Sequence, residues 1–332
     1  MHSRSYGIIL AASLAAAPLQ LSGLTAAPTA ETRVRAVSAD LLSRNETIED
    51  LAYFRDMWSP KERSFTPDTR AQFNTFVADQ ISKARPMSRA GLALVFAQGE
   101  AFTRNAHSEP NYLQIDGLFH SLPISFWTFA DGPFVTRAHP SFRELLGARI
   151  ERIGGVPFAI AADRVGRFIA GTTERKRYLA PAFLSRIEVL EAVGLAKNGS
   201  TGFDFILPTG RKRHVLLAVA PRTDPLAGNS TWAASLAPPK GADSWLHVID
   251  AARVRPLYLG DPAELTMEKV GDGSVAYIRS TSLSPYSDDA YAVASKAYKI
   301  VDDLVRPWQR RHDAIVDLRY NGGGNLFKIW HE

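Results

Sequence analysis

A run of glycines directly after an apolar segment is the first feature of this sequence that could do chemistry. Residues 314–318 read Ala-Ile-Val-Asp-Leu, and Arg-Tyr-Asn then leads into Gly322, Gly323 and Gly324. Glycine lets the backbone take positive φ and turn its N–H groups outward with no Cβ in the way. Such a turn can hold a phosphate or an oxyanion. A plain tight turn is the alternative, and the pattern alone leaves it open.

The nucleotide-binding motifs do not fit this run. A dinucleotide fingerprint needs a glycine at the sixth position, which Phe327 occupies, and the Gly-Lys-Ser/Thr of a P-loop is absent. By elimination, an oxyanion hole is the better functional interpretation. The sequence has no cysteine, no His-Glu-x-x-His and no Gly-x-Ser-x-Gly. This excludes thiol chemistry and argues against a zinc hydrolase and an α/β-hydrolase.

The segments before the glycines predict a βαβ unit. Residues 275–281 alternate apolar and polar side chains as a strand does. Ser287 is then expected to cap a helix that closes at Pro307, and residues 314–318 form a continuous apolar strand, expected to be buried. Such a unit carries its functional end after the second strand. Residues 244–332 are therefore predicted to be α/β.

Helices are predicted for residues 31–110. Thr47 and Asp50 have the spacing of a capping box, and Thr66, followed by proline, is a strong helix start. Ser88 opens a third candidate helix.

The next region, residues 111–225, changes character, because short apolar runs alternate with Gly and Pro. A helical segment near 180–195 and a closing hairpin of 203–207 and 214–219 complete a small β-rich module. Residues 226–243 are rich in Pro, Gly, Ala and Ser and are predicted to form a linker.

Two segments resemble the same family. Residues 314–325, Ala-Ile-Val-Asp-Leu-Arg-Tyr-Asn-Gly-Gly-Gly-Asn, resemble the Asp-Leu-Arg-x-Asn-x-Gly-Gly segment of tail-specific (C-terminal processing) and tricorn-type serine peptidases. Residues 145–157, Leu-Leu-Gly-Ala-Arg-Ile-Glu-Arg-Ile-Gly-Gly-Val-Pro, resemble the signature of a PDZ-like module. Residues 245–279 resemble the entry to the protease core. The resemblance implies an α/β multidomain protein: a helical region, a PDZ-like peptide-binding module at 111–225 and an incomplete crotonase-like α/β protease core at 244–332.

The resemblance also implies catalytic roles. A glycine N–H of the family's loop helps to form the oxyanion hole, so Gly322, Gly323 and Gly324 take that role as a group. His107 stands where many members carry Asp-x-His-(Ser/Thr), and in tricorn-like branches that histidine is the general base, which suits imidazole. Asn105 replaces the usual aspartate. A surface or capping histidine is the alternative for His107, and the other branch of the family uses a Ser-Lys dyad.

The family's nucleophilic serine lies well after the glycine loop. Between Asn325 and Glu332 the sequence has no Ser, Thr or Cys. The resemblance therefore implies that the nucleophile is absent from this chain, cut short before that segment. We expect the 332-residue polypeptide to lack peptidase activity alone and to expose an unpaired sheet edge. Ser280, Ser282 and Ser284 follow a strand and are interpreted as turn residues.

Export is predicted by residues 1–30, which have a basic start, a small-residue apolar stretch and further small residues, the layout of a signal peptide. The apolar stretch is too short for a comfortable membrane span, although an uncleaved anchor is an alternative. The net charge of 39 − 34 = +5 falls in short runs at 174–177 and 211–214 rather than along the basic face that nucleic acid needs. We expect a periplasmic or extracellular protein with no nucleic-acid partner and no stable membrane insertion beyond the signal segment.

The sequence thus favours a serine-type endopeptidase that acts on exported proteins or peptides and needs no metal or organic cofactor. Its PDZ-like module would bind an extended peptide or its C-terminus by strand addition, with backbone N–H groups capturing the carboxylate. A non-catalytic exported peptide-binding protein is the alternative, and a nucleotide-binding α/β protein is a third.

Overall fold

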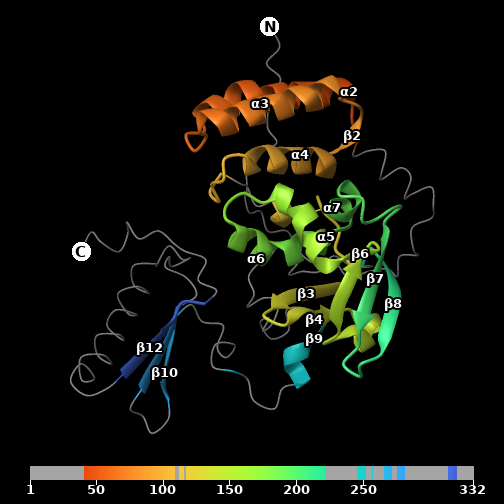
Figure 1. Ribbon diagram of the computed structural model, residues 1–332, viewed down its shortest axis with the longest axis vertical. Helices are drawn as coiled ribbons and strands as arrows, with labels where there is room; N and C mark the ends of the chain where they lie inside the picture. Colours follow the sequence, from red (N-terminus) through yellow and green to blue (C-terminus); the bar gives the residue numbers. More distant parts are fainter. Residues whose placement is uncertain are drawn as a thin grey trace, which may run out of the picture. The chain divides into compact units, whose positions relative to one another are not determined.

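The computed structural model describes the following residues: 41–108, 112–115, 117–220, 245–251, 256, 265–270, 275–280 and 313–319. Its helices (Figure 1) are α2 (Arg44–Tyr53), α3 (Pro67–Ser82), α4 (Arg89–Ala101), α5 (Phe158–Val165), α6 (Thr173–Leu184) and α7 (Ile187–Ala192), with a π-helix η1 (Phe54–Trp58) and 3₁₀ turns η2 (Ser59–Lys61), η3 (Tyr112–Gln114), η4 (Pro140–Leu145), η5 (Gly166–Phe168) and η6 (Val248–Ala251). Its strands are β1 (Leu41–Leu42), β2 (Met87–Ser88), β3 (Ile124–Phe129), β4 (Gly132–Ala138), β5 (Arg149–Ile153), β6 (Val156–Pro157), β7 (Ser200–Ile206), β8 (Lys212–Ala218), β9 (Leu246–His247), β10 (Leu265–Val270), β11 (Val275–Ser280) and β12 (Asp313–Asp317).

The first described helix begins one turn earlier than predicted. Ser43 caps α2, and Ser43 and Glu46 form a reciprocal capping box, with the Ser43 N–H donating to Glu46 Oε2 at 2.8 Å. Thr47 is buried inside the helix, and its hydroxyl donates to the Ser43 carbonyl at 3.0 Å. The prediction of a Thr47–Asp50 capping box is therefore wrong, because Ser43 satisfies the free N–H groups of the first turn.

The two later helix starts are confirmed. Thr66 caps α3, with proline at the first helical position, and its hydroxyl accepts the N–H of Thr69 at 3.2 Å. Ser88 caps α4 and accepts the N–H of Gly91 at 3.1 Å. Both caps use short hydroxyl side chains that satisfy otherwise unpaired N–H groups.

Aromatic side chains join the N-terminal helices. Phe54 lies at ring-centroid distances of 4.7 Å from Trp58, 5.0 Å from Phe73 and 4.7 Å from Phe96. These rings bring α3 and α4 against η1, and each buried ring adds a large apolar area to the cluster. Figure 1 shows α2 and α3 next to each other, with α4 beneath them.

A seven-stranded sheet forms the middle of the described chain. Its order is β3-β4-β5-β7-β8, with β6 paired to β5 and β9 paired to β4. All pairings between its described strands are antiparallel, and the predicted closing hairpin is confirmed as β7 and β8. The helical segment near 180–195 is also present, although α6 starts earlier, at Thr173. Strands β3 and β8 stand at the two ends of this order.

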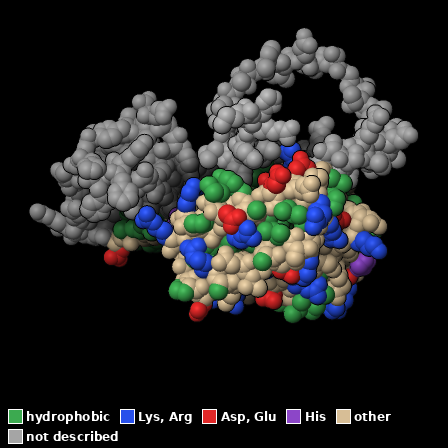
Figure 2. Space-filling model, turned by 90° about the horizontal axis from the view of Figure 1, so that it is seen from above, with side chains coloured by type: hydrophobic (Ala, Val, Ile, Leu, Met, Phe, Trp, Pro, Cys, Tyr) green, Lys and Arg blue, Asp and Glu red, His purple; other side chains and the backbone are tan. Residues whose placement is uncertain are grey.

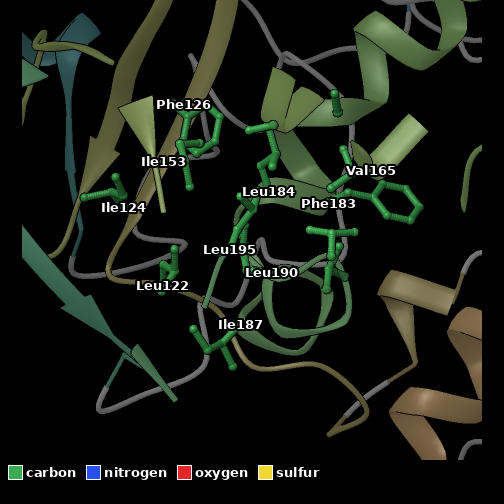
Figure 3. Packing of buried hydrophobic residues seen from close by; sticks show 14 of the residues in the cluster. Leu122, Ile124, Phe126, Ile153, Val165, Phe183, Leu184, Ile187, Leu190 and Leu195 are labelled. Atoms are coloured by element: carbon green, nitrogen blue, oxygen red, sulfur yellow. The ribbon is translucent and has the colours of Figure 1, made fainter. Parts of the chain in front are cut away.

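The main core lies between this sheet and the helices that cover it (Figure 3). Strands contribute Ile124, Phe126 and Ile153, while α6 and α7 contribute Leu184 and Leu190, all at most 2% exposed. Helix α4 contributes to both cores, since its Leu92 packs with the N-terminal helices and its Leu94 with the sheet. A helix apolar on two faces therefore joins the helical layer to the sheet.

A second, three-stranded sheet has the order β10-β11-β12. Strands β10 and β11 are antiparallel, and β11 and β12 are parallel, with Val275 opposite Asp313. The predicted parallel pair is confirmed. The prediction that this strand is buried is wrong for Ile315 and Val316, which are 50% and 60% exposed. Successive side chains of a strand point to opposite faces of the sheet, so both faces are exposed at these two positions.

Several predictions fall outside the described residues: the signal peptide at 1–30, the linker at 226–243, the helix from Ser287, and Gly322 to Gly324. The division into regions 31–110, 111–225 and 244–332 stays a prediction. Figure 2 shows one face of the molecule, where Lys and Arg are interspersed with Asp, Glu and hydrophobic side chains. No helix of the described part of the chain combines the length and apolar character that a membrane crossing needs.

Candidate active site

The turn that carries His107 is held by its own side chains. The hydroxyl of Thr103 accepts the N–H of Asn105 at 3.0 Å, and Asn105 Oδ1 accepts the N–H of His107 at 3.1 Å. Side-chain oxygens that accept backbone N–H groups two residues on form stable Asx- and ST-turns. The backbone is therefore fixed as it leaves α4, while the His107 side chain is exposed to solvent.

A second loop, between η2 and α3, forms hydrogen bonds to this turn. Asn105 Nδ2 donates to Ser64 Oγ at 2.7 Å, and Ser108 Oγ donates to Glu62 Oε2 at 2.9 Å. The other oxygen of Glu62 accepts the N–H of Ser64 at 2.7 Å. His107 thus lies between two residues, Asn105 and Ser108, that are each bound to the same loop.

Arg70 anchors that loop to α3. Its Nη1 donates to the Ser59 carbonyl at 2.8 Å and its Nη2 to the Glu62 carbonyl at 2.9 Å. Burial works to raise the pKa of Glu62, but hydrogen bonds from Ser64 and Ser108 and the charge of Arg70 outweigh it and lower the pKa. The carboxylate that holds Ser108 is therefore ionised at neutral pH.

This arrangement suits a general base. A histidine that removes a proton needs a fixed backbone and a ring that a substrate can reach, because proton transfer requires hydrogen-bond distance. Asn105 supplies the ordering oxygen that the resemblance assigns to an aspartate. Glu62 and Ser64 were missed from the sequence, because nothing in their local pattern connects them to His107.

The end of β12 is the second ordered element. Asp317 Oδ1 accepts the backbone N–H of Arg319 and its Nε, both at 2.9 Å. Asp317 Oδ2 accepts the Arg319 Nη2 and the hydroxyl of Tyr277, which reaches across from β11. The Asp317 side chain is 2% exposed and the Arg319 side chain 54%. The Asp-Leu-Arg segment thus fixes the backbone where β12 ends.

These contacts shift all three ionisation equilibria. Hydrogen bonds from the Arg319 side chain are the main reason that the pKa of Asp317 lies well below its usual range, against the opposing effect of burial. The same hydrogen bonds raise the pKa of Arg319. Burial, followed by the hydrogen bond to Asp317, raises the pKa of Tyr277. The anchor is therefore an ion pair at neutral pH. Gly322, Gly323 and Gly324 follow it in sequence and lie outside the described residues.

Strand β3 is a third element, at one end of the order of the seven-stranded sheet. It pairs with β4 alone among the described strands. The His139 N–H donates to the Pro123 carbonyl at 2.9 Å, so Pro123 faces the β4 side. Because successive residues of a strand direct their backbone groups to opposite sides, Ile124, Phe126 and Thr128 direct theirs away from β4. Helix α6 lies beside this strand, where Tyr178 meets Trp127 edge-to-face at 5.1 Å.

Two other histidines pair with carboxylates. His120 Nδ1 lies 2.5 Å from Glu188 Oε1, and His214 Nδ1 lies 2.6 Å from Asp204 Oδ1 across the β7–β8 ladder. A carboxylate on Nδ1 fixes the orientation and tautomer of an imidazole. Within the described ranges, no group of three or more His, Asp and Glu side chains could hold a metal ion.

No protein-family model matches the chain, and no curated protein sequence matches it. Among solved structures, mature CPAF complexed with lactacystin is similar, with a TM-score of 0.48 and 14% identity over 85% of this chain and 57% of that chain. A CPAF mutant gives a TM-score of 0.49 and 14% identity over 86% of this chain and 57% of that chain. The photosystem II D1 C-terminal processing protease gives a TM-score of 0.22 and 10% identity over 85% of this chain and 61% of that chain.

The chain therefore spans less than two thirds of the length of each of these structures. The third of these structures is by name a C-terminal processing protease. Residues 314–325 resemble the glycine segment of that class. With TM-scores below 0.5, these similarities carry no argument about function, and we argue it from the chain's own residues.

Proposed function

We propose that this chain belongs to a serine-type endopeptidase of the tail-specific class that acts on exported polypeptides. The observation that carries the proposal is the ordered turn around His107, bound on one side through Asn105 and on the other through Ser108. An exposed histidine with no role would not need a second loop to fix the backbone on both sides of it.

In the proposed reaction, His107 removes the proton from the serine hydroxyl as its oxygen attacks the peptide carbonyl. The carbonyl oxygen then becomes an oxyanion, which the N–H groups of Gly322, Gly323 and Gly324 are proposed to stabilise. The Asp317–Arg319 anchor would set the direction in which the chain enters that glycine turn. We assign the nucleophile to none of the 332 residues.

The polypeptide would add as an extra strand on the side of β3 that pairs with no described strand, where Thr128 is exposed while Ile124 and Phe126 are buried. Main-chain hydrogen bonds give such strand addition its affinity, and neighbouring side chains give it selectivity. Trp127 and Tyr178 stand beside this edge and supply aromatic surface for substrate side chains.

Binding is tested with proline substitutions on two strand ends. Thr128→Pro removes an N–H that points away from β4, so it blocks the added strand and leaves the β3–β4 ladder intact. Leu216→Pro is the matched control, because Leu216 lies on the other end strand, β8, and is 66% exposed. We expect Thr128→Pro to weaken binding of fluorescein-labelled unfolded casein about tenfold. Equal binding by both variants, or loss only in Leu216→Pro, would place the site elsewhere.

Catalysis is tested with the protein purified from the organism that produces it. Because a general base contributes roughly 10²–10⁴-fold to the rate, we expect His107→Ala to lower kcat for casein hydrolysis by about that factor. His214→Ala is the control, since its ring is held by Asp204 in the β7–β8 hairpin. The chain of residues 1–332 alone is expected to bind casein without cleaving it. Undiminished hydrolysis by His107→Ala would remove the proposed base.

Export is part of the proposal and rests on residues 1–30. Deleting them is expected to leave the protein in the cytoplasm of a bacterial host, as measured by cell fractionation. If the deletion leaves the distribution between fractions unchanged, the segment is not an export signal.

A further inference from the structure

Strand β8 stands at the other end of the seven-stranded sheet and pairs with β7 alone among the described strands. At the turn between them, the N–H of Leu207 donates to the Arg211 carbonyl at 2.9 Å. At the far end, Ser200 lies opposite Ala218 but exchanges its backbone hydrogen bonds with Lys197. The backbone groups of successive residues alternate between the two sides of a strand. The residues that turn theirs away from β7 are therefore Lys212, His214, Leu216 and Ala218.

This edge of β8 is open to solvent. Leu216 is 66% exposed, and the side chain of His214 is 67% exposed. Lys212 and Ala218 are exposed as well. The same four residues that direct their N–H and carbonyl groups outward thus stand at an accessible position.

Only the first half of this edge carries the usual protection. Soluble proteins block an end strand with charged side chains, proline or a bulge. Strand β8 has no proline, and its register with β7 runs without a bulge. Its charged residues stand at the start, whereas residues 216–219 carry no charge, although Leu216 and Val219 are both exposed. The second half of β8 is therefore a template on which another strand can pair.

The basic residues at the start of β8 are already close to carboxylates of the same sheet. Arg213 Nη2 lies 3.5 Å from Glu144 Oε1, and Lys212 Nζ lies 3.9 Å from Glu151 Oε2. These pairs balance most of the positive charge of the hairpin locally. Acidic charge is therefore not the feature that selects a partner for this edge.

A second copy of the chain fits the edge in one antiparallel register. A two-fold axis that passes between the two Val215 residues sets outward-facing backbone against outward-facing backbone. Lys212 then lies opposite Ala218 of the second copy. His214 likewise lies opposite Leu216 of the second copy. This register pairs all four outward residues of both strands, whereas a shift by two residues leaves one of them unpaired on each strand.

The charges and apolar side chains suit this pairing. Because the two strands run in opposite directions, the basic end of one copy lies beside the uncharged end of the other. The two Leu216 side chains become diagonal neighbours on the outer face, a separation that long side chains can span. A strand already ordered by its own β7 also loses less conformational freedom on pairing than an unfolded polypeptide does. A second copy is therefore a better occupant than an extended peptide.

We infer that β8 pairs with β8 of a second copy of this chain and forms a two-fold symmetric dimer in which the two sheets become continuous. The inference does not depend on the proposed peptidase function, because it uses the end of the sheet opposite to β3.

The lack of cysteine in the sequence allows a direct test with the full chain. In the inferred register, Val215 lies opposite Val215 of the second copy as a pair without mutual hydrogen bonds, whose Cα atoms are about 4.5 Å apart. That separation is within the range of a disulfide. Oxidation of Val215→Cys with diamide should therefore give a disulfide-linked dimer on a non-reducing gel. Thr209→Cys, at the exposed tip of the hairpin, is the matched control and should stay monomeric, because the two tips lie at opposite ends of the pair.

Sedimentation equilibrium measures the same association without a cross-link. We expect the wild-type chain to dimerise reversibly. Leu216→Pro removes one outward N–H from each copy, so it should raise the dissociation constant at least about tenfold. Proline is tolerated where the N–H of an end strand faces solvent, and far-UV circular dichroism checks that this variant is folded.

A wild-type chain that stays monomeric up to about 100 μM would overturn the inference. So would a dimer that Leu216→Pro leaves intact, or cross-linking of Thr209→Cys as strong as that of Val215→Cys. Binding of fluorescein-labelled poly-glutamate to a monomeric wild type, but not to Leu216→Pro, would instead identify an acidic polypeptide as the occupant of the edge.

Discussion

Asn105 Oδ1 accepts the N–H of His107 at 3.1 Å, and the same side chain donates to Ser64 Oγ at 2.7 Å. One amide group thus orders the turn from inside and ties it to a loop distant in sequence. Replacing Asn105 with alanine removes both hydrogen bonds and leaves the His107 N–H without its acceptor.

We expect Asn105→Ala to lower the local stability of residues 103–108 by about 1–2 kcal/mol, the cost of a lost hydrogen bond with its partner left unmade. Hydrogen–deuterium exchange of these amides, compared with those of α3, measures it. Asn105→Asp is the matched control, because its carboxylate still accepts the His107 N–H and can accept the Ser64 hydroxyl. Equal exchange in the wild type and Asn105→Ala would show that the turn does not depend on Asn105.

The same turn should loosen in acid through Glu62. The pKa of Glu62 is lowered in the folded protein, whereas an unfolded glutamate has a pKa of about 4.3. Ionised Glu62 therefore stabilises the turn above that pH, and the stabilisation is lost as the pH falls through the folded value. We expect exchange in residues 103–108, corrected for intrinsic rates, to rise below about pH 4 in the wild type. In Glu62→Gln it should be faster at neutral pH and nearly independent of pH; parallel profiles for the two proteins would contradict this role.

A third prediction concerns the anchor at the end of β12. Asp317→Asn removes the charge that holds Arg319, while the neutral amide stays buried against Tyr277. Since Arg319 is half exposed and can be hydrated again, we expect a loss of about 2 kcal/mol in the stability of the β11–β12 pair. Asp313→Asn, an exposed position at the start of the same strand, should change it little. Exchange of the β11 and β12 amides measures both variants, and equal effects would show that the buried pair does not stabilise the sheet.

Local rules predicted much of the fold. Thr66 and Ser88 cap helices, as their residue types and the residues after them indicate. Strands β11 and β12 pair in parallel, as a βαβ pattern requires. The first helix start was wrong because Ser43 and Thr47 both have an acidic residue three positions on. Glu46 completes a capping box with Ser43, whereas the Thr47 side chain is buried.

The candidate site was less predictable, because long-range contacts build it. Ser108 meets Glu62 and Asn105 meets Ser64 across more than forty residues of sequence, and no periodicity connects these positions. A resemblance can name His107, but the loop that binds the residues on both sides of it appears only in three dimensions.

The glycine pair in the PDZ-like signature provides a last prediction. Gly154 has a φ of +56° and Gly155 a φ of +80°, so alanine is strained at both positions. A Cβ on Gly154 would lie 2.3 Å from the backbone oxygen of Leu195, whereas a Cβ on Gly155 would meet nothing within 4 Å. The Gly154 N–H also donates to the Gly202 carbonyl at 2.8 Å, so the backbone cannot easily move aside.

We therefore expect Gly155→Ala to cost about 1–2 kcal/mol, the penalty of positive φ alone. Gly154→Ala should cost at least about 3 kcal/mol, because it must also displace the chain at Leu195 or break the bond to Gly202. Urea unfolding followed by tryptophan fluorescence measures both values. If the two variants were equally stable, the close approach of β5 to the segment after α7 would not be what requires glycine at the first position of the pair.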